Sequence, residues 1–212
     1  MHTQPTIIED CSPFYIRLVF DELDSIIQFV RSKLDKLVLR HKSTYSDKVF
    51  PVEISKEIIS LLPKYFAFDF RLERVSVFDT SPGKGCGIHK DGKDHRVSFN
   101  IPIEIHDDLC TTYWYDDDQF SDYSKKLSTE PLSVTMNGST GYSRNIHPNF
   151  QSMNKFKHSK SMVASPGEMI LFNTDIFHSW YNRSNYSRKI LTLRVNNPGS
   201  MYFDDAKKIL NL

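Results

Sequence analysis

Two histidines, one aspartate and one arginine are spaced in this sequence in a way that suits metal chemistry. His89 and Asp91 form an HxD step directly after the glycine-rich segment SPGKGCG, and His178 and Arg188 follow far downstream. Side chains two residues apart on an extended strand project from the same face, so His89 and Asp91 could bind one ion together. Two imidazoles and one carboxylate can hold Fe(II) while three coordination positions stay open. We therefore expect a metal site at His89, Asp91 and His178.

The HxD step by itself is weak evidence. With 8 His and 18 Asp in 212 residues, about 0.7 such steps arise by chance. A second HxD step, His106-Asp107-Asp108, illustrates this. We favour the first step because it follows a strand pattern and a glycine-rich turn and precedes a strand with a polar face. His106 lies in a charged turn, which is typical of solvated surface.

Short strands are the elements that would position these residues. Alternation is clearest in Arg96–Ile103, where every second residue from Val97 is apolar. No helical pattern separates the later strands, which disfavours a doubly wound α/β fold and favours a jelly roll. Strands are also predicted at Leu72–Thr80, Thr111–Tyr115, Leu132–Met136, Glu168–Phe172, Ile176–Tyr181 and Lys189–Val195.

Helical periodicity dominates the N-terminal third. An apolar stripe at helical spacing runs through Asp21–Leu39, and a shorter helix is predicted from near Ser55 until Pro63. We therefore expect one mainly β domain with flanking helices (α+β) over residues 1–212. Residues 1–66 would form a helical support, residues 67–200 the jelly-roll core, and residues 201–212 a C-terminal helix.

Overall composition excludes several classes of protein. The chain carries 27 Lys and Arg against 26 Asp and Glu, a net charge of +1, which lacks the positive excess of a dedicated nucleic-acid binder. No apolar run approaches the roughly 20 residues of a membrane span, and no secretory signal pattern is visible. Three widely spaced cysteines fit a reducing compartment rather than a disulfide framework. We expect a soluble, cytoplasmic protein.

Taken together, these residues resemble the HxD…H…R motif of the iron(II)/2-oxoglutarate-dependent dioxygenase superfamily. The motif runs from His89 and Asp91 through His178 to Arg188, and HSWYNRSNYSRKILTL is similar to the last two core strands of the family. The resemblance covers Leu72–Asn196. It implies a double-stranded β-helix, the cupin-like form of the jelly roll, which agrees with the strand pattern.

The resemblance also implies a role for each motif residue. His89, Asp91 and His178 would be the Fe(II) ligands. Arg188 would bind the distal carboxylate of 2-oxoglutarate, a task that suits a planar bidentate cation.

The predicted last strand places four residues on one face, namely Arg188, Ile190, Thr192 and Arg194. Two arginines on one interior face need anionic partners, because an unpaired buried charge is costly. Thr192 could add a hydroxyl contact to 2-oxoglutarate, and Arg194 could reach the co-substrate or an acidic substrate. Ile190 stands where some family members have serine, which puts the second carboxylate contact in question.

With Fe(II), O2 and 2-oxoglutarate, the resemblance implies a hydroxylase that oxidises a C–H bond of a small molecule or an amino-acid or peptidyl substrate. Succinate and CO2 would be released. The retained Asp91 disfavours the halogenating branch. The alternatives are an oxidative nucleobase dealkylase, whose final strand RKILTLR resembles, and a non-catalytic jelly-roll module that binds a metal or ligand. A zinc hydrolase ranks last, because no additional general base is obvious near the motif.

Contacts to the substrate stay open at this stage. The polar segments Asp116–Thr129 and Ser139–Lys160 are predicted loops, and the second carries four cations and no acid, which hints at an acidic substrate. Neither nucleic acid nor a membrane is expected as a partner, and no oligomeric state is indicated. Alternation alone does not say which strand face points inward. The pocket could therefore include Arg96, Ser98, Asn100, Tyr113, Trp114, Tyr115 and Trp180.

Overall fold

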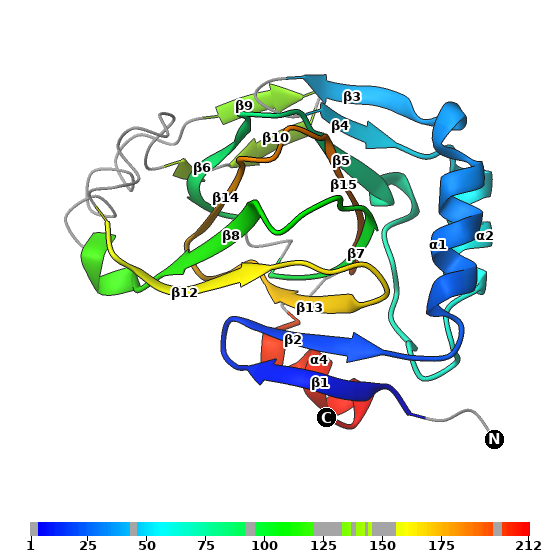
Figure 1. The fold of residues 1–212 in the computed structure, drawn as a ribbon. Helices are drawn as coiled ribbons and strands as arrows, with labels where there is room; N and C mark the ends of the chain where they lie inside the picture. Colours follow the sequence, from blue (N-terminus) through cyan, green and yellow to red (C-terminus); the bar gives the residue numbers. More distant parts are fainter. Residues whose placement is uncertain are drawn as a thin grey trace.

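Two antiparallel sheets lie face to face in the computed structural model of this chain (Figure 1). The structure describes residues 4–42, 46–91, 96–120, 133–136, 139–142, 144–145, 156–196 and 201–212. Within these ranges, no helix has the length and apolar character needed to cross a membrane. The mainly β architecture with flanking helices matches the predicted fold class.

The larger sheet has eight strands and carries the main hydrophobic core on its outer face. Apolar side chains of its central strands pack there against the helices α1 (Leu23–Ser32), α2 (Val52–Ser60) and α4 (Phe203–Leu210). This burial follows from alternation, since every second residue of a strand faces one side. In spatial order the strands are β1 (Thr6–Cys11), β2 (Tyr15–Val19), β13 (Met169–Asn173), β7 (Val97–Glu104), β15 (Arg188–Arg194), β5 (Ser76–Thr80), β4 (Ser46–Val49) and β3 (Val38–Lys42).

The smaller sheet has five strands and faces the inner side of the larger one. Residues between the two sheets form a second apolar cluster around Trp114, which stacks on Tyr15 with ring centroids 5.0 Å apart. In spatial order the strands are β11 (Arg144–Asn145), β6 (Gly85–Lys90), β14 (His178–Asn182), β8 (Cys110–Tyr115) and β12 (His158–Val163). The strands β9 (Ser133–Met136) and β10 (Ser139–Tyr142) form a separate hairpin.

The prediction of a helical N-terminal region is wrong in part, because residues 1–66 also supply four strands of the larger sheet, β1 to β4. Helix α1 ends at Ser32, and a 3-10 turn, η1 (Leu34–Lys36), follows it. Val38 and Leu39 belong to β3 and are 57% and 51% exposed. The apolar stripe of Asp21–Leu39 therefore combines the helix α1 with the 3-10 turn that follows it. The turn keeps Leu34 and Leu37 packed against the core.

Other observed elements begin or end a few residues away from their predicted bounds. Leu72–Arg74 forms a 3-10 turn, η2, before β5, and the turn at Gly83 gives way to β6 two residues later. Part of the predicted loop Ser139–Lys160 is strand, in β10, β11 and the start of β12, while 146–155 lie outside the described residues. Of the predicted loop Asp116–Thr129, Asp117–Phe120 form a 3-10 turn, η3, and 121–129 lie outside the described residues. The predicted C-terminal helix matches α4.

That residues 1–212 form one domain stays a prediction.

Candidate metal centre

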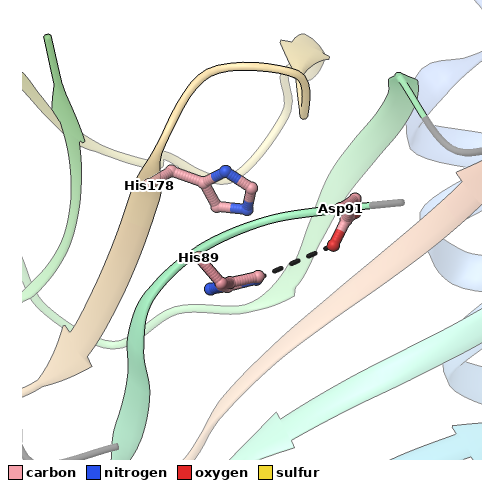
Figure 2. Close-up of side chains that lie close together, drawn as sticks. All are labelled: His89, Asp91 and His178. Atoms are coloured by element: carbon pink, nitrogen blue, oxygen red, sulfur yellow. Dashed lines mark ion pairs between the residues drawn. The ribbon is translucent and has the colours of Figure 1, made fainter. Parts of the chain in front are cut away.

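The three predicted ligands come together at the junction of β6 and β14. His89 lies in β6, Asp91 follows that strand directly, and His178 opens β14, where it pairs in register with His89. One potential ligand atom from each residue lies within 4.8 Å of the others. The His89 Nε2 and Asp91 Oδ1 atoms are 3.7 Å apart (Figure 2). This arrangement fits one divalent ion bound on a single face.

Backbone carbonyls orient both imidazole rings. The Nδ1 atoms of His89 and His178 lie 2.8 Å from the carbonyl oxygens of Gly87 and Ile176, each two residues earlier in the chain. A carbonyl oxygen can only accept, so each Nδ1 must carry the proton that it donates. A neutral ring then presents the lone pair of Nε2 to the site, which is the form that binds metals.

Burial and neighbouring charges act differently on the two rings. Burial, together with the adjacent His89, lowers the pKa of His178 to about 3 and keeps that ring neutral at neutral pH. Burial also lowers the pKa of His89, but the neighbouring Cys86 and Asp91 have a larger effect in the opposite direction and raise this pKa to about 9. Protons and metal ions therefore compete for Nε2 of His89.

Arg194 holds the carboxylate ligand from the opposite sheet. Its Nη1 atom donates to Asp91 Oδ2 over 3.0 Å, which engages one carboxylate oxygen and leaves Oδ1 directed toward His89. Such charge-assisted hydrogen bonds fix the orientation of a ligand. From the sequence, Arg194 was expected to reach the co-substrate or an acidic substrate. The structure shows a direct link to the triad, and the predicted contact to 2-oxoglutarate stays a prediction.

The triad lines a cavity between the two sheets. This cavity has about 570 Å³ of empty space, part of it open to solvent. All four residues of the predicted inner face of the last strand line it, in agreement with their predicted parity. The remaining walls are apolar or carry small hydroxyl and amide groups. Besides the triad, the lining residues are Phe78, Ser98, Asn100, Thr112, Phe172, Thr174, Trp180, Arg188, Ile190, Thr192 and Arg194.

Arg188 brings an uncompensated cation to this cavity. Burial lowers the pKa of its guanidinium, although the adjacent Cys110 thiol opposes that change. Its Nε atom is buried without a hydrogen-bond partner, and Arg188 takes part in none of the ion pairs found among the described residues. A buried arginine of this kind is stabilised by an anion that reaches it from the cavity.

Thr192 and Asn100 form a polar pair on the cavity wall. The Thr192 hydroxyl donates to the Asn100 side-chain oxygen over 2.9 Å, which directs the amide nitrogen of Asn100 away from Thr192. The hydroxyl proton of Thr192 is therefore engaged with Asn100 in this structure. Its predicted contact to 2-oxoglutarate stays a prediction, and Asn100 is the stronger candidate for a donor.

The structure decides the open question of which residues face inward. Ser98, Asn100 and Trp180 line the cavity, whereas Arg96 points elsewhere, 3.7 Å from Asp175 and over the ring of Tyr202. Trp114 is fully buried in the core cluster between the sheets.

Neither remaining aromatic residue of β8 lines the cavity. Tyr113 packs against His158, and the Tyr115 hydroxyl lies 2.9 Å from that of Ser179. The rival histidine of the second HxD step, His106, contacts Tyr186 away from the triad. Thr112 and Thr174 also line the cavity and were not predicted from the sequence, although Thr112 alternates with Trp114 and so faces the interior.

Comparisons with known proteins identify the fold. No family model matches this chain, and no curated protein matches its sequence. HygX from Streptomyces hygroscopicus, solved with nickel and 2-oxoglutarate, is similar with a TM-score of 0.57 and 10% identity, over 87% of this chain and 83% of that one. SnoK, a non-heme α-ketoglutarate-dependent carbocyclase from nogalamycin biosynthesis, gives 0.55 and 11%, over 94% and 89%. This chain has the fold of non-heme 2-oxoglutarate-dependent enzymes.

The double-stranded β-helix that the HxD…H…R resemblance implied is therefore confirmed. At this level of identity the likeness concerns the fold, and the chemistry depends on the residues of this chain. The double-stranded β-helix places the triad on the smaller sheet and Arg188 on the larger one, with the cavity between them.

Proposed function

We propose that this protein is an Fe(II)- and 2-oxoglutarate-dependent dioxygenase that hydroxylates a C–H bond of a small molecule or an amino-acid or peptidyl substrate. One observation carries the proposal: the triad and the uncompensated cation of Arg188 line the same cavity. When bound, Fe(II), O2 and 2-oxoglutarate together supply C–H oxidation, with release of succinate and CO2.

The residues of the site suit these groups. His89, Asp91 and His178 would hold the metal through two neutral imidazoles and one carboxylate, a set that leaves coordination positions open. Arg188 would bind the distal carboxylate of 2-oxoglutarate. A dicarboxylate offers one carboxylate to the arginine and keeps the other for the metal, so it matches both ends of the cavity.

The chain also controls access of water. Phe78, Phe172, Trp180 and Ile190 line the same cavity as the triad. Apolar walls of this kind orient a substrate and exclude water from a reactive centre. The likeness to HygX, which has also been solved with hygromycin B, supports a small-molecule substrate. The cytoplasmic location expected from the unpaired cysteines stays a prediction.

The test is anaerobic titration of the purified protein with Fe(II) and 2-oxoglutarate. We expect a weak visible charge-transfer band and, after admission of air, release of succinate. The band should disappear in His178→Ala and persist in His106→Ala, which removes the histidine of the rival HxD step. Absence of both the band and succinate from the wild-type protein would refute the proposal.

A further inference from the structure

A row of packed aromatic rings connects the metal centre to the N-terminal hairpin. The His178 ring packs against Phe172 with centroids 5.0 Å apart, and Phe172 packs against Trp114 at 4.9 Å. Trp114 stacks on Tyr15 at 5.0 Å, with an angle of 26° between the ring planes. We define the aromatic path as Phe172, Trp114 and Tyr15. Trp114 is also the cross-strand partner of His178 in the smaller sheet, so strand pairing holds these two residues together.

Two members of the aromatic path have side chains that are readily oxidised. Indole and phenol lose an electron more easily than a phenyl ring, so Trp114 and Tyr15 are the members that can carry a radical. Phe172 is not oxidised, but it lines the cavity and fills the space between His178 and Trp114. Trp114 and Tyr15 are 0% and 1% exposed, which keeps water and solutes away from both rings. An electron that follows the aromatic path therefore crosses packed protein atoms at every step.

The indole nitrogen of Trp114 has no base beside it. Its Nε1 atom is buried and has no hydrogen-bond partner in the described part of the chain. Buried polar groups are rarely left without a partner, and a redox role is one reason for an exception. An oxidised indole that loses its Nε1 proton becomes a weaker oxidant. Because no acceptor for this proton is in contact, oxidised Trp114 stays a radical cation and keeps the power to oxidise Tyr15.

At the outer end of the aromatic path, Glu9 is the base that Tyr15 needs. The Tyr15 hydroxyl donates to Glu9 Oε1 over 3.0 Å, and the Cys11 thiol donates to the same oxygen over 3.1 Å. Burial, followed by the neighbouring Cys11 and Glu9, raises the pKa of Tyr15, so the phenol is protonated at neutral pH. A phenol gives up an electron readily only when its proton moves to a base. Cys11 pairs with Tyr15 across the hairpin and is partly exposed, so solutes can reach its thiol.

We propose that Trp114 and Tyr15 carry oxidising equivalents from the metal centre to the Cys11 thiol when O2 and 2-oxoglutarate react there without a substrate. Trp114 gives an electron toward the metal centre. Tyr15 replaces that electron and passes its proton to Glu9. Cys11 then reduces the Tyr15 radical, while Glu9 returns the proton to Tyr15 and takes the thiol proton in its place. Glu9 is partly exposed and releases this proton to water.

Two such transfers balance as a complete reaction. The first leaves a thiyl radical on Cys11, a small thiol from solution adds to it, and the second removes the remaining electron. Two S–H bonds break and one S–S bond forms, which is a mixed disulfide. The two electrons and two protons reduce to water the oxygen atom that would have entered the substrate. In sum, 2-oxoglutarate, O2 and two thiols give succinate, CO2, water and a disulfide. The oxidant rests on the proposed function, and thiol oxidation goes beyond it.

Electron transfer along the aromatic path can be tested first on the metal-free protein, independently of the proposed function. A UV flash ejects an electron from tryptophan, and transient absorption follows the indole and tyrosyl radicals separately. We expect the tyrosyl signal to grow as the indole signal decays, and to be lost in Tyr15→Phe, which removes only the hydroxyl. It should also be lost in Trp114→Phe, although Trp180 remains. The matched control is Tyr113→Phe, which changes a tyrosine that packs against His158 instead, and it should behave like the wild type.

A second measurement locates the oxidation in the loaded protein. The full-length protein with Fe(II), 2-oxoglutarate and glutathione is exposed to air without a substrate, and its peptides are mapped by mass spectrometry. We expect glutathione on Cys11, and this adduct should require 2-oxoglutarate. The adduct should be lost in Tyr15→Phe and retained in Tyr113→Phe. Circular dichroism checks that both variants are folded.

Three outcomes would overturn the inference. The first is a tyrosyl signal that is unchanged in Tyr15→Phe. The second is glutathione on Cys86 in place of Cys11, because Cys86 lies 3.6 Å from His89 and can be oxidised directly. The third is oxygen added to Trp180 while Cys11 stays a thiol, which would mean that the oxidant is consumed in the cavity. Absence of succinate refutes the proposed function instead, and the flash measurement still decides whether Trp114 oxidises Tyr15.

Discussion

At the scale of single residues, the site depends on side chains that are aimed by hydrogen bonds. Each histidine of the triad donates Nδ1–H to a carbonyl two residues earlier, and Asp91 is held by Arg194. Side chains fixed in this way lose little conformational freedom when a metal binds, which favours binding.

The role of Arg188 can be tested by its effect on 2-oxoglutarate alone. Arg188→Lys keeps a positive charge but loses the two parallel N–H donors of the guanidinium, so we expect the KM for 2-oxoglutarate to rise about tenfold to hundredfold. The metal affinity should stay the same, because Arg188 does not contact the triad. Steady-state kinetics and metal titration check both values. An unchanged KM would contradict the assignment, and Arg183→Lys is the matched control.

The link between Arg194 and Asp91 predicts a different phenotype. Arg194→Gln leaves one oxygen of the carboxylate ligand unheld, and we expect the metal affinity to fall about tenfold to hundredfold. Arg194→Lys should recover part of it. Competition with a chelator of known affinity measures the change. If Arg194→Gln binds metal like the wild type, the arginine does not position the ligand.

At the scale of elements, a network of charges ties the N-terminal hairpin of the larger sheet, β1 and β2, to the smaller sheet. Glu9 of β1 accepts from the Tyr15 hydroxyl over 3.0 Å and from Arg17 over 3.2 Å, both on β2. The ammonium of Lys160 in β12 lies 3.7 Å from Oε1 of the same carboxylate. One carboxylate thus connects the larger sheet to the smaller one.

This network makes part of the stability depend on pH. Burial alone would raise the pKa of Glu9, but hydrogen bonds from Cys11, Tyr15 and Arg17 lower it below its usual value of 4.5. A carboxyl whose folded pKa is depressed stabilises the protein above pH 4.5, and that stabilisation is lost as the pH falls through the folded pKa.

Glu9→Gln should therefore lower the Tm at pH 7, and the difference from wild type should shrink below pH 4.5. Thermal melts across this range measure it. The matched control is Glu57→Gln on the exposed side of α2, where we expect no change. A difference that does not vary with pH would mean that the carboxylate charge is not what stabilises the hairpin.

At the scale of the whole molecule, the site spans both sheets. His89 and His178 belong to β6 and β14 of the five-stranded sheet, and Arg188 and Arg194 belong to β15 of the eight-stranded one. Figure 1 shows these three strands. The ion pair between Asp91 and Arg194 already bridges them. A ligand held at one end by the triad and at the other by Arg188 would add a second bridge.

We therefore expect Ni(II) and 2-oxoglutarate together to raise the Tm. At a hundredfold excess over Kd the stabilisation is about 2.7 kcal/mol, or about 5–10 °C for a chain of this size. The increase in Tm that 2-oxoglutarate adds should require the metal and should disappear in Arg188→Ala. Addition of EDTA should reverse the increases in Tm from both the metal and 2-oxoglutarate. Equal stabilisation by 2-oxoglutarate in Arg188→Ala would show that it binds elsewhere.

Local pattern alone determined a large part of this protein. The strands β7, β8, β9, β13, β14 and β15 and the shared inner face of the last strand follow from local pattern, because the geometry of a strand fixes which residues share a side. The spacing of His89, Asp91 and His178 was visible for the same reason. The strands β10, β11 and β12 were not predicted. The edge strands of the N-terminal third were missed, since β1 is exposed on both faces and shows no alternation.

Only the tertiary structure decided which contacts form across the two sheets. Alternation is symmetric between the faces of a strand, so Ser98 and Asn100 could be assigned to the cavity only once helices were seen to cover the other side. The pairing of Asp91 with Arg194 joins residues 103 positions apart. Such a contact depends on how the sheets close, and no local spacing encodes that.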